Sequence, residues 1–133
     1  MVTRYLLDTN VLIDMFRGDA AVQRQIAEHG PENCYISEFS ISELKVGYYR
    51  TRNTRERSCI DFVLENFHII KCSSAILDRY AKILAELQSQ GRKACVMDMM
   101  IMATALVNEM TVVTNDAHFT FLESLKHEDW KTA

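Results

Sequence analysis

Four acidic side chains stand where short apolar runs and predicted helices could bring them together. Asp8 ends one apolar run, and Asp116 follows another by two residues. Asp98 opens a mostly apolar stretch, and Glu43 lies about one turn into a predicted helix. Four ionised acids in one pocket would repel, at roughly 3 kcal/mol for a pair about 5 Å apart at an effective dielectric of about 20. A divalent cation would remove that cost, so the pattern points to a metal site.

The residue types narrow both the metal and its chemistry. Ligation by carboxylates alone favours hard, oxygen-preferring ions, which here means Mg²⁺ or Mn²⁺. The sequence holds no Cys-x-x-Cys and no Cys/His pairing of the kind that binds zinc. The reaction expected of such a site is phosphoryl transfer, in which the ion orients and acidifies a water and neutralises charge on the phosphate.

Each acid also has a purely structural interpretation. Asp8 could form only the turn before a helix, and Asp98 could only favour a helix N-terminus. Asp116 could be an N-cap, while Ser40-Ile-Ser-Glu43 matches a capping box. What separates these alternatives from a metal site is whether the four carboxylates meet.

Positioning the acids requires short strands that alternate with helices. Such alternation indicates a parallel sheet with helices on both faces. Ligands bind such sheets outside the carboxyl ends of the strands, where Asp8 and Asp116 are predicted to lie. The strands are predicted at 3–8, 34–36, 67–70 and 111–114, with an edge strand in the tail from Glu128; the helices are predicted at 11–16 (capped by Thr9 and Asn10), 20–29, 37–49, 55–66, 74–90, 97–109 and 116–122.

Size and composition describe an ordinary single domain, which we place at residues 1–133. Four glycines and one proline are too few for a many-turned all-β chain. The most apolar stretch, 96–107, has 12 residues and contains Asp98, which is too short and too charged to span a bilayer. With no signal peptide visible, we expect a cytoplasmic protein that does not bind a membrane and whose four cysteines are reduced.

The charge pattern restricts any contact with nucleic acid to one local region. The chain has a net charge of −3, which excludes a globally basic surface. Between positions 45 and 57, however, five basic residues face one acid, Glu56. We interpret this segment as a phosphate-contacting rim beside the acids, and the alternative is a solvated helix face. The predicted rim consists of Lys45, Arg50, Arg52, Arg55 and Arg57.

Aromatic and histidine side chains near these segments allow two interpretations. Tyr48, Tyr49 and Tyr80 could stack on RNA bases, although a core or interface role is the simpler expectation. His118 and His127 could act as general bases, but a site made of carboxylates needs neither. We therefore expect surface or packing roles for all four histidines.

Four segments of the chain resemble the motifs of a known family. They are Leu6-Leu-Asp-Thr-Asn-Val-Leu-Ile13, Ser42-Glu-Leu-Lys-Val-Gly47, Asp98-Met-Met-Ile-Met-Ala-Thr-Ala105 and Thr114-Asn-Asp-Ala-His-Phe119. In this order they resemble the PIN-domain ribonucleases, and most of all the VapC-type toxins of bacterial toxin–antitoxin pairs. The one small departure is Met102, where the family more often has alanine.

The resemblance implies a three-layer α/β sandwich with a parallel sheet of four to five strands flanked by helices. It implies an Mg²⁺- or Mn²⁺-dependent endoribonuclease that acts on single-stranded or loop RNA. It also implies a homodimer and a cognate antitoxin, with DNA contacted only through that antitoxin. By resemblance, Asp8 and Asp98 hold the metal, and Glu43 and Asp116 complete the pocket and position water. The side chains implied to support these acids are Asn10, Ser42 and Thr114.

Three other functions remain to be weighed. A phosphorelay receiver domain needs an aspartate at the end of its third strand, where this chain has Ile69-Ile-Lys-Cys72. A haloacid-dehalogenase-type phosphatase needs Asp-x-Asp, where this chain has Asp8-Thr-Asn10. The last alternative is a non-catalytic binding module of the same fold, with the acids as helix caps.

Overall fold

Five parallel strands form the central sheet of the computed structural model, which describes residues 2–131. Residues 1, 132 and 133 of the predicted domain lie outside the described residues. The strand order is β3-β2-β1-β4-β5, so the chain builds outward from β1 in one direction and then, from β4, in the other. The strands are β1 (Tyr5–Leu7), β2 (Cys34–Ser37), β3 (His68–Ile70), β4 (Thr111–Val113) and β5 (His127–Glu128).

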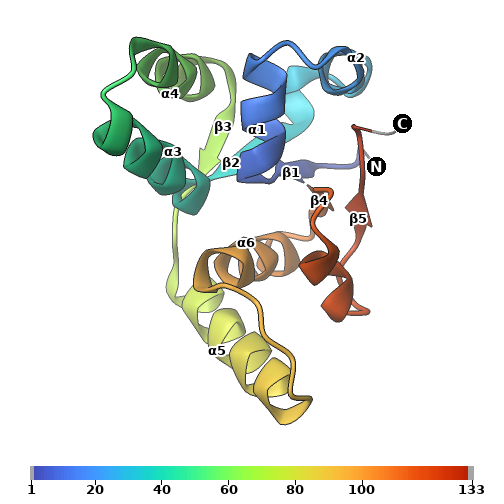
Figure 1. Cartoon of the computed structure of the whole chain (residues 1–133). Helices are drawn as coiled ribbons and strands as arrows, with labels where there is room; N and C mark the ends of the chain where they lie inside the picture. Colours follow the sequence, from blue (N-terminus) through green and yellow to red (C-terminus); the bar gives the residue numbers. More distant parts are fainter. Residues whose placement is uncertain (1, 132–133) are drawn as a thin grey trace.

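Helices cover both faces of this sheet, which confirms the predicted three-layer sandwich. Four helices pack on one face and two on the other (Figure 1). The first face is covered by α1 (Thr9–Phe16), α2 (Ala20–His29), α3 (Glu38–Thr51) and α4 (Thr54–Asn66), and the second by α5 (Ser74–Ser89) and α6 (Val96–Val107); two short 3-10 helices are η1 (Pro31–Asn33) and η2 (Ala117–Phe121).

The alternation of side chains along each strand divides the core in two. Leu7 and Val113 face the α1–α4 side, whereas Leu6 and Val112 face the α5–α6 side. Helix α6 is apolar almost all round and is correspondingly buried, as such helices usually are. No helix within residues 2–131 has both the length and the hydropathy needed to cross a membrane.

The predicted helix starts differ from the observed ones where a better cap stands earlier in the chain. Helix α1 begins at Thr9, because Asp8 is extended and its carboxylate accepts the backbone N–H of Thr9. The prediction that Thr9 and Asn10 cap this helix is therefore wrong. Helix α3 continues through Arg50 to Thr51, where Arg52 ends it in the left-handed conformation with φ 56°.

Candidate functional site

Asp8 and Asp116, the first and last of the four candidate acids along the chain, follow neighbouring strands at the same edge of the sheet. Strands β1 and β4 pair in parallel with Leu7 opposite Val113, so Asp8 follows β1 at the edge of the sheet where Thr114 follows β4, and Asp116 comes two residues later. The order of the strands reverses between β1 and β4. This is the point at which parallel sheets open a crevice for a ligand.

Asp8 is the most buried of the four acids, with 3% of its surface exposed. One carboxylate oxygen accepts the Thr9 N–H at 2.8 Å, and the other accepts the Thr114 hydroxyl at 2.9 Å. The pKa of Asp8 is raised to about 6. Burial is the largest cause, the charges of Asp98 and Glu43 add to the rise, and the two hydrogen bonds oppose it. The carboxylate is thus held in place at a position where its charge is costly.

Glu43 reaches the same pocket from α3 and is held by the first residue of α1. The Thr9 hydroxyl donates to Glu43 Oε1 at 2.6 Å and lies 3.0 Å from the Ser40 hydroxyl. The capping-box interpretation of Glu43 is wrong, because Ser37 is the N-cap of α3 and Ser40 lies inside the helix. Glu43 is therefore a half-buried acid that faces the carboxyl edge of the sheet.

Asp98 and Asp116 form the more open part of the pocket together with a histidine. One potential ligand atom from each of Asp98, Asp116 and His118 lies within 4.8 Å of the other two. Asp98 stands in the first turn of α6, and its pKa is raised by burial and by the charge of Asp116, while a hydrogen bond with Cys95 and the charge of His118 lower it.

Thr114 joins the two parts of the pocket. Its hydroxyl donates to Asp8 and accepts the backbone N–H of Asp116 at 3.0 Å. Asp116 also caps η2, so its structural role and its place in the pocket coexist. The same holds for Asp8, the N-cap of α1. From here on, the acidic pocket means Asp8, Glu43, Asp98 and Asp116.

The donor set of the acidic pocket fits a hard divalent cation. Its oxygens come from carboxylates, and in residues 2–131 no lysine or arginine forms an ion pair with Asp8, Glu43 or Asp98. The pKa values of Asp8 and Asp98 are both raised, so ionising these acids without a counter-charge costs free energy. A cation ligated by carboxylates would supply that charge.

The supporting residues differ in part from those that the family resemblance implies. Thr114 is buried and donates to Asp8. Asn10 and Ser42 are exposed, and the hydroxyl that donates to Glu43 belongs to Thr9, which also lies 3.0 Å from the Ser40 hydroxyl. Sequence reasoning missed the contact of Thr9 with Glu43, because it joins residues 34 positions apart on different helices.

His118 is a further residue that sequence reasoning missed. Its ring Nδ1 lies 2.8 Å from Asp116 Oδ1, which also accepts the His118 backbone N–H at 2.9 Å. The spacing carried a usable signal, because an aspartate often accepts the backbone N–H two residues later. Such a turn brings the imidazole back toward the carboxylate, while the side chain stays exposed and packs against Phe121, as a surface or packing role predicts.

The predicted basic rim surrounds the end of α3 and the start of α4. The Arg52 guanidinium lies over the rings of Tyr48 and Tyr49, 5.6 and 5.0 Å from their centres, and Arg57 lies 5.5 Å from that of Tyr48. Arg55 lines a cavity of about 230 Å³ together with Glu43. Lys45 and Arg50 are exposed on α3, and Tyr49 is exposed while Tyr48 and Tyr80 pack partly against the two cores.

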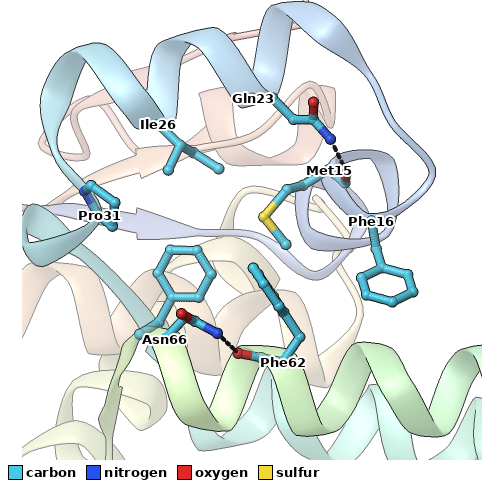
Figure 2. A pocket seen from close by; sticks show the side chains of 8 residues that line it. Met15, Phe16, Gln23, Ile26, Pro31, Phe62 and Asn66 are labelled. Carbon is cyan, nitrogen blue, oxygen red and sulfur yellow. Dashed lines mark hydrogen bonds between the residues drawn. The ribbon is translucent and has the colours of Figure 1, made fainter.

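A second cavity, of about 420 Å³, is larger but chemically plain. Figure 2 shows it between α1, α2 and α4, with Met15, Ile26 and Phe62 among its walls. Its two amides, Gln23 and Asn66, donate to the backbone oxygens of Met15 and Phe62. No acid, base or nucleophile lines it, so the candidate active site is the acidic pocket.

Comparison with known proteins finds one family along most of the chain. A family model described as PIN domain matches residues 5–123. Ribonuclease VapC1 of Rickettsia felis is 28% identical over 113 residues, which cover 82% of each chain. The structure of VapBC2 from Rickettsia felis bound to a promoter DNA fragment matches with a TM-score of 0.88 and 24% identity, over 96% of this chain and 99% of that one. DNA-bound VapBC from Salmonella typhimurium also gives a TM-score of 0.88, at 21% identity, over 96% and 98% of the two chains.

Proposed function

The chain belongs to the PIN domain family, and from that membership we propose that it is a metal-dependent endoribonuclease and the toxin of a toxin–antitoxin pair. The observation that carries the proposal is that four acids lie close together. Two of them follow strands β1 and β4, and the other two stand on helices α3 and α6. The name of the related Ribonuclease VapC1 supports the substrate class. We place the whole sequence, 1–133, in one domain of this kind.

In this proposal the cofactor is Mg²⁺ or Mn²⁺, held directly by Asp8 and Asp98. When bound, such an ion neutralises charge on a phosphate and makes water a better nucleophile. Thr9 and Thr114 fix the two oxygens of Asp8 through its hydrogen bonds, so this ligand is already oriented before the ion arrives.

The remaining acids act on water and on the scissile phosphodiester. Glu43, fixed by the Thr9 hydroxyl, and Asp116, fixed by its cap contacts, position the attacking water by accepting its hydrogen bonds; one of them takes up the single proton that the water loses, and the leaving 3′ oxygen is protonated from solvent. Because water attacks phosphorus and the 3′ oxygen leaves, the products carry a 5′-phosphate and a 3′-hydroxyl. No 2′-hydroxyl of the substrate takes part.

The basic rim guides the substrate to the pocket. Arg55 lines the cavity that Glu43 also lines, and Arg17 enters it from the end of α1. Lys45, Arg50, Arg52 and Arg57 extend this positive region over the surface, where they contact phosphates of single-stranded or loop RNA.

The partners follow from the toxin assignment. The related VapC structures are solved as VapBC complexes, some of them with DNA. We propose that this chain forms a homodimer, binds a cognate antitoxin protein and meets DNA only through that antitoxin. A toxin that cuts cellular RNA acts in the cytoplasm.

The experiment that tests the function compares RNA ends made by the wild type and by Asp98→Asn. We expect the wild type to cut RNA with Mg²⁺ or Mn²⁺, to leave 5′-phosphates, and to stop when a chelator is added. Asp98→Asn should fold and fail to cut, while Asp78→Asn, an exposed acid on α5, should cut like the wild type. Full activity of Asp98→Asn, or activity without metal, would contradict the proposed metal site, and a wild type that cuts no RNA with either ion would leave the non-catalytic binding module as the better account.

A further inference from the structure

Among the described residues, His118 is the one histidine whose ring lies close to acids of the acidic pocket. One of its two ring nitrogens lies within 4.8 Å of a carboxylate oxygen of Asp98 and of one of Asp116. The side chain is 47% exposed, so an ion can reach it from solvent. The ring also meets Phe121 edge-on, with 5.4 Å between ring centres, and this contact limits how far the imidazole can swing away.

We propose that the imidazole of His118 is a ligand of the active-site cation and shifts the preference of the site from Mg²⁺ toward Mn²⁺. This inference rests on the proposed metal-dependent nuclease and adds a nitrogen donor to its carboxylates.

The hydrogen bond to Asp116 leaves the ring suited to that role. An ionised carboxylate only accepts hydrogen bonds, so the 2.8 Å contact places the ring proton on Nδ1. In the neutral ring, Nε2 then keeps its lone pair. Histidines that bind metals commonly donate their other ring N–H to a carboxylate in this way, which fixes the tautomer and makes the free nitrogen a better ligand. Asp116 would thus orient His118 as well as contribute to the pocket.

A nitrogen ligand changes the choice between the two candidate ions. Mg²⁺ is small and hard, strongly prefers oxygen and gains little from imidazole. Mn²⁺ also prefers oxygen and stands at the weak end of the transition series, but as a transition ion it accepts imidazole nitrogen more readily than Mg²⁺ does. With His118 the pocket should therefore bind Mn²⁺ much more tightly than carboxylates alone would, while its affinity for Mg²⁺ should change little.

The test uses the metal alone as probe, at pH 8 and without RNA. Binding of Mn²⁺ is followed by its electron paramagnetic resonance, Mg²⁺ is measured by competition, and electron spin-echo envelope modulation reports nitrogen bound to Mn²⁺. His118→Asn keeps an N–H near the position of Nδ1 but lacks the second ring nitrogen, and His118→Ala lacks both. His127→Asn, on the exposed edge strand β5, is the matched control.

We expect nitrogen modulation in the wild type and in His127→Asn, and its loss in both His118 variants. Their Mn²⁺ affinity should fall at least about tenfold, since even the outer partners of metal ligands commonly contribute that much. Their Mg²⁺ affinity should change by less than about threefold.

Three outcomes would overturn the role of His118. They are a wild type without nitrogen modulation, modulation that persists in His118→Asn, or Mn²⁺ affinity that is lost in His118→Ala but kept in His118→Asn. The last result would mean that the ring only holds Asp116. If Asp98→Asn binds Mn²⁺ as tightly as the wild type, the metal site itself is misplaced and the proposed function fails with it.

Discussion

The two parts of the acidic pocket are built differently. Around Asp8 and Glu43, the carboxylates are tied to the hydroxyls of Thr9 and Thr114, and Asp8 is shielded from solvent. Around Asp98 and Asp116, the groups are half-buried, and the nearest partner of Asp116 is a titratable ring. The difference teaches that the buried part is preorganised at the expense of stability, whereas the open part is where water and substrate can enter.

The largest expected effect comes from removing the buried charge. Asp8→Asn should reduce RNA cleavage by about 10³-fold or more, since loss of one preorganised charged group in an active site costs at least about 10²–10³-fold. Asp116→Asn, in the open part, should cost less, about 10- to 100-fold, because in the proposed mechanism Asp116 positions water and does not hold the ion directly. Initial rates at saturating Mn²⁺ measure both. Equal losses in the two variants would remove the distinction between the two parts.

The stability of the metal-free protein should depend on pH through Asp8. Its pKa in the folded state is about 6, above its ordinary value of 3.8. The folded state therefore holds the proton more tightly, and stability falls as the pH rises from about 4 to above 6, by up to about 3 kcal/mol. Chemical denaturation with a chelator present, between pH 4.5 and 8, measures this.

Asp8→Asn isolates that effect from the rest of the titration. The variant should be more stable than the metal-free wild type above pH 6, and the gap should narrow as the pH falls toward 4.5. A constant difference between wild type and Asp8→Asn at every pH would contradict the account.

The role of the basic rim is tested by the salt dependence of RNA binding. The binding measurement uses the Asp8→Asn variant, which should bind RNA without cutting it. In that background, replacing Arg52, Arg55 and Arg57 by glutamine should weaken binding of single-stranded RNA. The slope of log K against log salt should become shallower by about two, at roughly 0.7 for each lost phosphate contact. Filter binding between 50 and 300 mM salt measures the slope. The control replaces three basic residues on α2 and α5, namely Arg24, Arg79 and Lys82, and should leave the slope unchanged.

The smallest expected effect distinguishes Thr9, whose hydroxyl contacts Glu43, from Ser42, which the family resemblance implies as the supporting residue. Thr9→Val removes the 2.6 Å hydrogen bond to Glu43 and should slow cleavage by about tenfold, in line with a charged hydrogen bond worth about 1.5–3 kcal/mol. Ser42→Ala, at an exposed position of α3, should change the rate by less than about twofold. Cleavage rates measure both, and a larger loss in Ser42→Ala would restore the original assignment.

Much of the fold could be predicted because its signals are local. The alternation of short apolar runs with periodic segments gives the parallel sheet, and Ser73 and Gly91 bracket α5 where the structure has it. Asp8 and Asp116 could be placed at strand ends from sequence position alone. The start of α1 was misjudged by two residues because Asp8 and Thr9 are both good N-caps, and only the structure shows which is used.

The rest of the site depends on packing that no spacing encodes. Glu43 and Asp98 reach the pocket because α3 and α6 pack on opposite faces of the sheet, and the contact of Thr9 with Glu43 follows from how α1 crosses α3. Ser42 is implied by the family resemblance alone, whereas Ser40, two positions earlier on α3, is the serine that contacts Thr9. His118 was missed because the argument from carboxylates alone left no role for an imidazole.

The most direct test of the central claim is the anomalous diffraction of manganese in crystals of the protein grown with Mn²⁺. The account predicts a strong peak inside the acidic pocket, within ligand distance of oxygens from Asp8 and Asp98. Well-ordered crystals with no peak there, or with manganese bound only elsewhere, would contradict it.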